Sequence, residues 1–195
     1  LETSQDILEV KAALIGIRKA CQEAKDWRPV QAQVTLDTNG RMLAGTDISA
    51  VQVILDGAGV DVIGLNCSTG PEHMRPSLEI LVQRTALPIS CMPNAGMPVN
   101  VDGEAVYPLK AEDFAKQMVD FVERLGVNVV GGCCGTTPNH IRQLVERIGK
   151  QKPATRVVER IPCLASALRA VDMRQQPSPF LIGERLNTQG SRVFK

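Results

Sequence analysis

Short apolar segments alternate with longer amphipathic segments along most of the chain, and this alternation limits the folds that it can adopt. The apolar segments have the length and β-branched character of buried strands, and they span residues 30–36, 60–66, 88–92 and 127–132. Segments with helical spacing span residues 4–24, 47–55, 72–85 and 111–125, and a final helix opens at Thr137-Pro138. Strand–helix units in series predict parallel strands joined by right-handed crossovers, and therefore an α/β fold.

The number of these units is small. About four strand–helix units fit between residues 30 and 149, and the helix over residues 4–24 precedes them without a strand of its own. Thr3 and Asp6 have the spacing of a capping box for that first helix. The chain has 195 residues, whereas a complete (β/α)8 barrel takes roughly 250. Its first residue is Leu1, which favours a piece of a longer chain.

The composition changes after residue 149. Residues 150–153 and 175–179 are rich in Lys, Gln and Pro, which predicts a linker over residues 150–179. One short helix is expected inside this linker, at Ala165–Ala170. Residues 180–195 then begin a further unit, so that the chain divides into 1–149, 150–179 and 180–195.

Charge and cysteine content exclude several classes of function. The chain has 22 Lys and Arg against 21 Asp and Glu, and this balance argues against nucleic acid or an anionic membrane as a partner. No run of about 18 apolar residues is present, so no membrane-spanning helix is expected. Six cysteines are too few for a secreted disulfide scaffold of this length, which favours free thiols and a cytoplasmic location.

Three polar loops rich in small residues directly follow apolar strands, at residues 64–71, 88–98 and 131–138. The carboxyl ends of parallel strands carry the active site in α/β folds. Two of these loops lead into helices, whose positive N-termini favour thiolates, and they contain Cys67, Cys133 and Cys134. Three protein ligands and one open position are typical of a catalytic zinc site. A substrate thiolate in the open position would be a nucleophile for transfer of an alkyl group onto sulfur.

Other cysteines and the histidines have simpler interpretations. The three motif cysteines could themselves be small buried hydrophobic residues, although their loops are polar. Cys21, Cys91 and Cys163 belong to no such loop motif, and Cys91 is expected to face the core. His73 and His140 lie in the first turns of helices, where capping or surface roles are expected.

The two cysteine loops resemble a known family. Gly64–Pro71 and Gly131–Pro138 are similar to the two zinc-binding motifs of homocysteine S-methyltransferases. The Pro93–Pro98 loop and Glu2-Thr3 also match strand ends of that family. The tail Ile182–Lys195 resembles the opening strand of a pterin-binding barrel, and these two domains in this order are typical of cobalamin-dependent members.

This resemblance implies a (β/α)8 TIM-type barrel of which the chain carries only the C-terminal half, with about four to five units. It implies that Cys67, Cys133 and Cys134 bind zinc and that the thiolate of homocysteine completes the coordination before methylation to methionine. It also implies that Glu2 contacts the substrate amino group and that Asn94 orients substrate or fills the open zinc position. Half a barrel is expected to have little or no activity by itself.

The resemblance further implies cofactors and partners. The methyl donor would be methylcobalamin on another module of the same polypeptide, and it would be recharged from methyltetrahydrofolate on the second barrel. Betaine- or S-methylmethionine-dependent members are an alternative, but these usually stop after one barrel, so the tail from Ile182 counts against them. A third alternative is a redox or metal-storage module that uses the adjacent Cys133 and Cys134 without methyl transfer.

Overall fold

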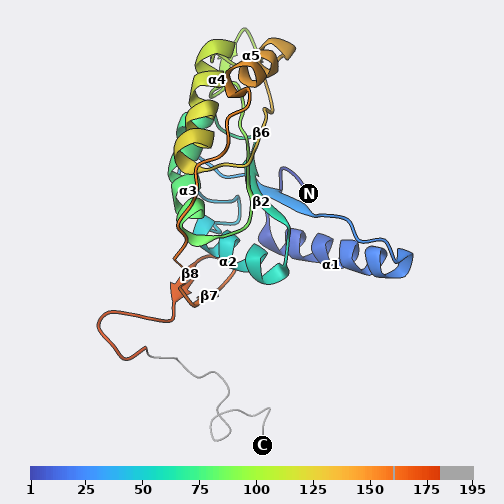
Figure 1. The fold of residues 1–195 in the computed structure, drawn as a ribbon, viewed down its shortest axis with the longest axis vertical. Coiled ribbons are helices and arrows are strands. Elements are labelled where there is room, and N and C mark those ends of the chain that lie inside the picture. Colours follow the sequence, from blue (N-terminus) through green and yellow to red (C-terminus); the bar gives the residue numbers. More distant parts are fainter. Residues whose placement is uncertain (160, 181–195) are drawn as a thin grey trace, which may run out of the picture.

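A four-stranded parallel sheet forms the centre of the chain in the computed structural model, which describes residues 1–159 and 161–180 (Figure 1). The strands lie in the order β1, β2, β3, β6, and each pair of neighbours is parallel. Their bounds are Gln31–Val34, Val62–Asn66, Ile89–Met92 and Val129–Val130. The expected strand at Ile182–Lys195 lies outside the described residues.

Each strand of this sheet is followed by a helix. These helices are α2 (Ile48–Ala58), α3 (Pro71–Arg84), α4 (Ala111–Asp120) and α5 (Pro138–Ile148), and a further helix, α1 (Ile7–Ala24), precedes β1. α4 continues into a π-helical turn, η1 (Phe121–Leu125), where the sequence pattern predicts one unbroken helix. The four strand–helix units and the parallel α/β fold are confirmed among the described residues.

The two faces of the sheet differ in polarity. Alternate strand residues join the aliphatic core beneath the helices, namely Ala32, Val34, Ile63, Leu65, Ile89 and Cys91. On the opposite face Gln33, Gly64 and Ser90 lie side by side in register across β1, β2 and β3. Burial of each large aliphatic side chain stabilises the fold by about 1.5–3 kcal/mol, so the helix-facing side holds the sheet together. The polar face is the side that a closed barrel would enclose.

The N-terminal residues extend the sheet beyond β1. Ser4 forms a parallel bridge with Val34, and the backbone N–H of Gln33 donates to the carbonyl of Leu1. The capping box expected at Thr3 is wrong: α1 begins at Ile7, and the Asp6 carboxylate caps it by accepting from the N–H of Leu8. Thr3 is instead held by tertiary contacts and adopts a left-handed backbone with φ of 53°.

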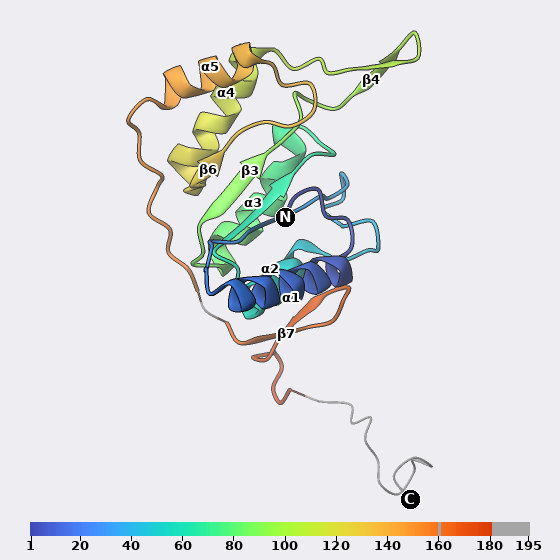
Figure 2. The same cartoon turned by 90° about the vertical axis from the view of Figure 1, so that its right-hand side faces the viewer.

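An antiparallel hairpin interrupts the connection between β3 and α4, and no hairpin is predicted there. Its strands are β4 (Val99–Val101) and β5 (Glu104–Val106), which project from the body of the molecule (Figure 2). Asp102 and Gly103 form the two-residue turn, with φ of 52° and 89°. Asp-Gly between alternating valines is a strong hairpin pattern, so the sequence contains the signal.

The segment predicted as a linker is docked on the fold over much of its length. The N–H of Ala154 donates to the Val122 carbonyl, and the Arg156 guanidinium donates to the carbonyls of Thr85 and Leu87, at 3.2 and 2.7 Å. The short helix expected at Ala165–Ala170 is wrong. These residues belong to an antiparallel hairpin of β7 (Cys163–Ala165) and β8 (Ala170–Asp172) that packs near α2.

Replacement of Arg156 by Ala is expected to loosen this segment. The side chain is partly buried, and burial lowers its pKa, yet its two hydrogen bonds join the segment to the chain after α3. Loss of charged hydrogen bonds should speed thermolysin cleavage at neighbouring Val157 by roughly tenfold. Arg169→Ala, at an exposed position, is the matched control and should leave the rate unchanged. Equal cleavage rates in the two variants would contradict the docking.

None of the helices in the described part of the chain is both long enough and apolar enough to span a membrane.

Candidate metal centre

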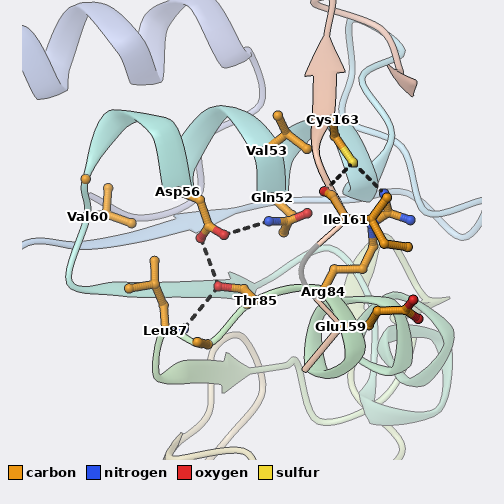
Figure 3. A pocket seen from close by; sticks show the side chains of 12 residues that line it. Gln52, Val53, Asp56, Val60, Arg84, Thr85, Leu87, Glu159, Ile161 and Cys163 are labelled. Atoms are coloured by element: carbon orange, nitrogen blue, oxygen red, sulfur yellow. Dashed lines mark hydrogen bonds between the residues drawn. The ribbon is translucent and has the colours of Figure 1, made fainter. Parts of the chain in front are cut away.

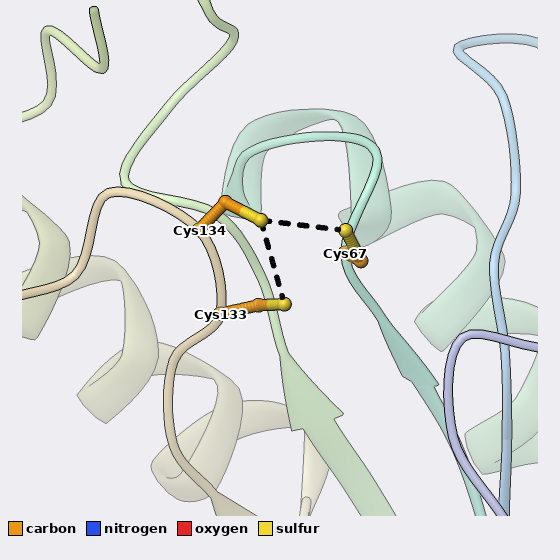
Figure 4. A group of neighbouring side chains, drawn as sticks. All are labelled: Cys67, Cys133 and Cys134. Atoms are coloured by element: carbon orange, nitrogen blue, oxygen red, sulfur yellow. Dashed lines mark hydrogen bonds between the residues drawn. The ribbon is translucent and has the colours of Figure 1, made fainter.

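Three cysteines from two loops meet at the carboxyl edge of the sheet (Figure 4). The sulfur of Cys134 lies 3.8 Å from that of Cys67 and 3.9 Å from that of Cys133. All three sulfur atoms lie within 4.8 Å of one another, although Cys67 is 66 residues from Cys133 in sequence. Among residues 1–159 and 161–180, this is the one such cluster of His, Cys, Asp and Glu side chains close enough to hold a metal ion.

The end of β2 positions Cys67 by an unusual backbone. Cys67 and Ser68 have φ of 61° and 62°, in the left-handed region that non-glycine residues rarely adopt. Such a conformation costs of the order of 1 kcal/mol or more for each residue, so the surrounding contacts must hold it. The N–H of Cys67 donates to the Met92 carbonyl at 3.1 Å, and the N–H of Thr69 donates to the Cys67 carbonyl at 2.7 Å.

The loop after β3 connects the two cysteine loops. The N–H of Asn94 donates to the Thr69 carbonyl, in the Cys67 loop, at 3.0 Å. The Asn94 side-chain oxygen accepts from the N–H of Cys134 at 3.1 Å, and the carbonyl of Pro93 accepts from the N–H of Cys133 at 2.8 Å. Because Asn94 is buried at 2% exposure, it bridges the two halves of the cluster from below the surface.

Two glycines allow these loops to approach closely. A Cβ atom on Gly70 would lie 2.7 Å from the Cα of Gly96, so any side chain there would push the loops apart. Gly96 itself has φ of 89°, which glycine adopts without strain. The spacing of the sulfur atoms therefore depends on backbone contacts as well as on the cysteines.

The cluster fits a tetrahedral metal site in its donors and in its dimensions. Zinc–thiolate bonds of about 2.3 Å place the sulfurs of a regular tetrahedron about 3.8 Å apart. The two sulfur–sulfur distances of 3.8 and 3.9 Å match this value. α3 and α5 begin shortly after Cys67 and Cys134, so the positive ends of two helices lie near the negative charge that three thiolates would carry.

The metal-free thiols differ in acidity. Burial and the contact with Cys67 raise the pKa of Cys133 to about 11. Burial also opposes ionisation of Cys134, but hydrogen bonds from Cys67, Cys133 and Tyr107 outweigh it and lower the pKa of Cys134. The expectation that helix N-termini favour all three thiolates is therefore wrong for Cys133, because desolvation dominates there.

Cys134 is expected to react faster than Cys133 with iodoacetamide in the metal-free protein. A pKa of about 11 leaves roughly one Cys133 thiol in a thousand ionised at pH 8, whereas the lowered pKa of Cys134 leaves more thiolate there. Cys134 is also exposed while Cys133 is half-buried. Mass-spectrometric mapping of alkylated peptides measures the two rates, and preferential labelling of Cys133 would contradict this order.

The remaining candidate residues lie in different surroundings. Glu2 is exposed, but its neighbour Thr3 exchanges two 2.8 Å hydrogen bonds with the side chain of Asn66, the residue before Cys67. Cys91 is fully buried, as expected. His140 forms the capping box of α5 with Thr137 and is not part of the cluster.

The other cysteines and His73 also lie away from the cluster. Cys21 is in α1 and His73 is exposed in the first turn of α3. Cys163 donates to the Asp172 carboxylate at 2.9 Å and accepts from Arg84 at 3.2 Å, so it joins the β7–β8 hairpin to α3.

Two residues near the cysteines have no signal in the strand–loop pattern. Asn66 ends β2 and accepts from the N–H of Thr3, which ties the N-terminal segment to the Cys67 loop. Tyr107 follows β5 and packs on Gly135, the residue after Cys134. The Asp-Gly turn signals the hairpin that carries Tyr107, but the direction of this hairpin depends on long-range packing.

A separate cavity of about 420 Å³ lies between α2, the end of α3 and the docked C-terminal segment (Figure 3). Its polar groups bond to one another: the Asp56 carboxylate accepts from Gln52 and from Thr85. The cavity lies near the C-terminal ends of helices, and therefore at the opposite edge of the sheet from the cysteines.

A parallel α/β fold with three thiols at the carboxyl edge of its sheet defines a class of candidate metal-binding domains. The homocysteine S-methyltransferase family profile matches residues 1–148. The chain belongs to the homocysteine S-methyltransferase family. The predicted family is thereby confirmed.

Individual relatives are similar over different lengths. The whole chain is 42% identical to methionine synthases of Mycobacterium leprae and Mycobacterium tuberculosis, of which it spans 17% and 16%. The chain therefore spans about a sixth of the length of these curated relatives. The crystal structure of the apo homocysteine methyltransferase MmuM from Escherichia coli superposes with a TM-score of 0.54 at 25% identity, over 75% of this chain and 48% of that one.

Proposed function

We propose that this chain is the zinc-binding, C-terminal part of the homocysteine-binding barrel of a cobalamin-dependent methionine synthase. The observation that most strongly supports this proposal is the cluster of Cys67, Cys133 and Cys134, with sulfur–sulfur distances of 3.8 and 3.9 Å. Family membership and the 42% identity to two methionine synthases support methylation of homocysteine to methionine as the reaction. The four strand–helix units and the alignment with 48% of the MmuM chain support half of a (β/α)8 barrel.

In this proposal the three cysteines hold the metal and leave one position for the substrate sulfur. Zinc bound there would lower the pKa of the homocysteine thiol and keep its sulfur nucleophilic, and methylcobalamin on another module would supply the methyl group. Asn94 keeps the cysteine loops together through Cys134 and Thr69, and in this proposal its amide would also orient the substrate or take the open zinc position. Glu2 would contact the substrate amino group from the N-terminal segment that Asn66 anchors.

The proposal extends to domain organisation and to partners. Residues 1–149 would belong to the homocysteine barrel, residues 150–179 to the connection between domains, and residues 180–195 to the first strand of a pterin-binding barrel. The cobalamin- and folate-binding modules would be parts of the same polypeptide, with methyltetrahydrofolate recharging the cobalamin. The extent of similarity to long methionine synthases supports this arrangement.

Binding of homocysteine tests the proposed function. Zinc-loaded protein should release close to one proton for each homocysteine bound at pH 7.5, because the thiol binds as a thiolate. Calorimetry in buffers of different ionisation enthalpy measures this proton. Methionine, whose sulfur carries no proton, is the control and should release none. Binding of homocysteine without proton release, or equally to zinc-free protein, would contradict the proposal.

The 195-residue chain alone is expected to have little or no methyl transfer activity. Among residues 1–159 and 161–180, its parallel sheet ends at the N-terminal segment on one side and at β6 on the other, so the sheet does not close into the barrel that carries an active site of this kind. Formation of methionine from methylcobalamin and homocysteine measures the activity. Robust turnover by this chain would contradict the half-barrel interpretation.

A further inference from the structure

His140 joins the second cysteine loop to a distant part of the chain. It lies six residues after Cys134, in the first turn of α5, and its side chain is buried. The Nδ1 atom of its ring accepts from the N–H of Thr137 at 3.2 Å, and its Nε2–H donates to the Leu109 carbonyl at 3.0 Å. Leu109 lies between the β4–β5 hairpin and α4. The two ring nitrogens therefore connect two backbone segments that are 31 residues apart in sequence.

The partners of the two nitrogens define the state of the imidazole. A backbone N–H can only donate, so Nδ1 accepts through its lone pair, and a carbonyl can only accept, so Nε2 carries the proton. The ring of Phe114, in α4, meets the His140 ring edge-on, with centroids 5.5 Å apart and an angle of 83° between the planes. Phe114 is fully buried, so this contact holds the imidazole between its two hydrogen-bond partners.

These hydrogen bonds close a circuit that includes a proposed metal ligand. The N–H of Leu109 donates to the Ala95 carbonyl at 3.0 Å, and the N–H of Ala95 donates to the Cys134 carbonyl at 2.9 Å. From Cys134 the chain runs through Thr137 into α5 and so returns to His140. The bonds of Ala95 join backbone groups, so the side chain of His140 is the link in this circuit that a substitution can remove.

We propose that His140 is a positioning residue that holds the loop of Cys133 and Cys134 in the geometry that binds the metal. This inference rests on the proposed function. A loop that is already fixed does not lose freedom when the metal binds, so loosening the loop would weaken zinc binding. Mutation of a group that orients a metal ligand typically weakens metal affinity 10–100-fold. Because His140 acts on Cys134 through Leu109 and Ala95, the expected effect is about tenfold, at the low end of this range.

The zinc affinities of two variants with side chains of similar length test this role. Methionine in His140→Met has no donor for the Leu109 carbonyl, so the affinity should fall about tenfold. Glutamine in His140→Gln has an oxygen for the Thr137 N–H and an amide N–H for the Leu109 carbonyl, so it should recover most of this loss. Competition with a chromophoric chelator measures the affinities. Cobalt(II) in place of zinc should give weaker tetrahedral absorption bands in His140→Met than in the parent, because the loop no longer holds its ligands in place.

A third variant separates positioning from general stability. Leu144→Val removes one methylene group from a buried side chain of the same helix and leaves the hydrogen bonds of His140 in place. It should be less stable than the parent in urea, yet it should bind zinc as the parent does. Parental affinity in His140→Met, no recovery in His140→Gln, or a loss in Leu144→Val equal to that in His140→Met would overturn this inference alone. A parent protein that binds no zinc would overturn the proposed function and this inference together.

Discussion

Replacement of Cys133 by Ser is expected to abolish stable zinc binding. A serine hydroxyl stays protonated near neutral pH and supplies no anionic sulfur, so Cys67 and Cys134 alone would face the metal. Mutation of a residue that hydrogen-bonds to a metal ligand typically weakens metal affinity 10–100-fold. Loss of a ligand itself should therefore weaken zinc affinity by at least about 100-fold. Competition with a chromophoric chelator measures the affinity, and elemental analysis after dialysis should fall from one zinc per chain to nearly none.

Cys21→Ser is the matched control for this variant. Cys21 lies in α1, outside the cluster, and the substitution makes the same chemical change. It should keep the full zinc content. Similar zinc content in the Cys21 and Cys133 variants would show that the three-cysteine cluster does not hold the metal.

Replacement of Gly64 by Ala is expected to destabilise the fold by about 3 kcal/mol, at the upper end of typical overpacking costs. The added methyl group would lie 1.9 Å from the Ser90 hydroxyl and 2.5 Å from the Ser90 carbonyl oxygen. The hydroxyl can rotate away, but the carbonyl belongs to β3, which pairs with β2 at this register. Because β2 leads directly to Cys67, the strain would also reach the metal centre. Urea denaturation measures the change in the free energy of unfolding.

Gly16→Ala provides the contrasting case. Gly16 lies inside α1, and a Cβ atom there would meet no other atom within 4 Å. Alanine should stabilise this helix by roughly 0.5–1 kcal/mol. Equal stability changes at Gly16 and Gly64 would contradict the close contact between β2 and β3.

The parts of the fold that the sequence predicts are those with a regular pattern. The stripe of Phe114, Met118 and Phe121 predicts the buried face of α4 and its continuation, and all three side chains are fully buried. The cysteines follow strands that end near residues 66 and 130. Because the carboxyl ends of parallel strands lie at the same edge of the sheet, the sequence predicts that these cysteines lie close together. The sulfur–sulfur distances follow from topology together with the backbone contacts of Asn94.

The features that the sequence misses depend on contacts between distant residues. Thr3 has the spacing of a helix cap, but its hydrogen bonds to Asn66 hold it beside the sheet. The composition of residues 150–153 predicts a linker, yet the nearby Arg156 donates hydrogen bonds to the carbonyls of Thr85 and Leu87, some 70 residues away in sequence. The position of Tyr107 likewise depends on Gly135, in another loop. Local patterns predict elements, whereas these partners follow only from the assembled fold.

X-ray absorption at the zinc edge tests the central claim most directly. Zinc-loaded protein should give three sulfur neighbours at about 2.3 Å, and addition of homocysteine should raise the number to four. Methionine, added in place of homocysteine, should leave the three-sulfur spectrum unchanged. A site with fewer than three sulfurs, or one whose spectrum does not respond to homocysteine, would contradict the account.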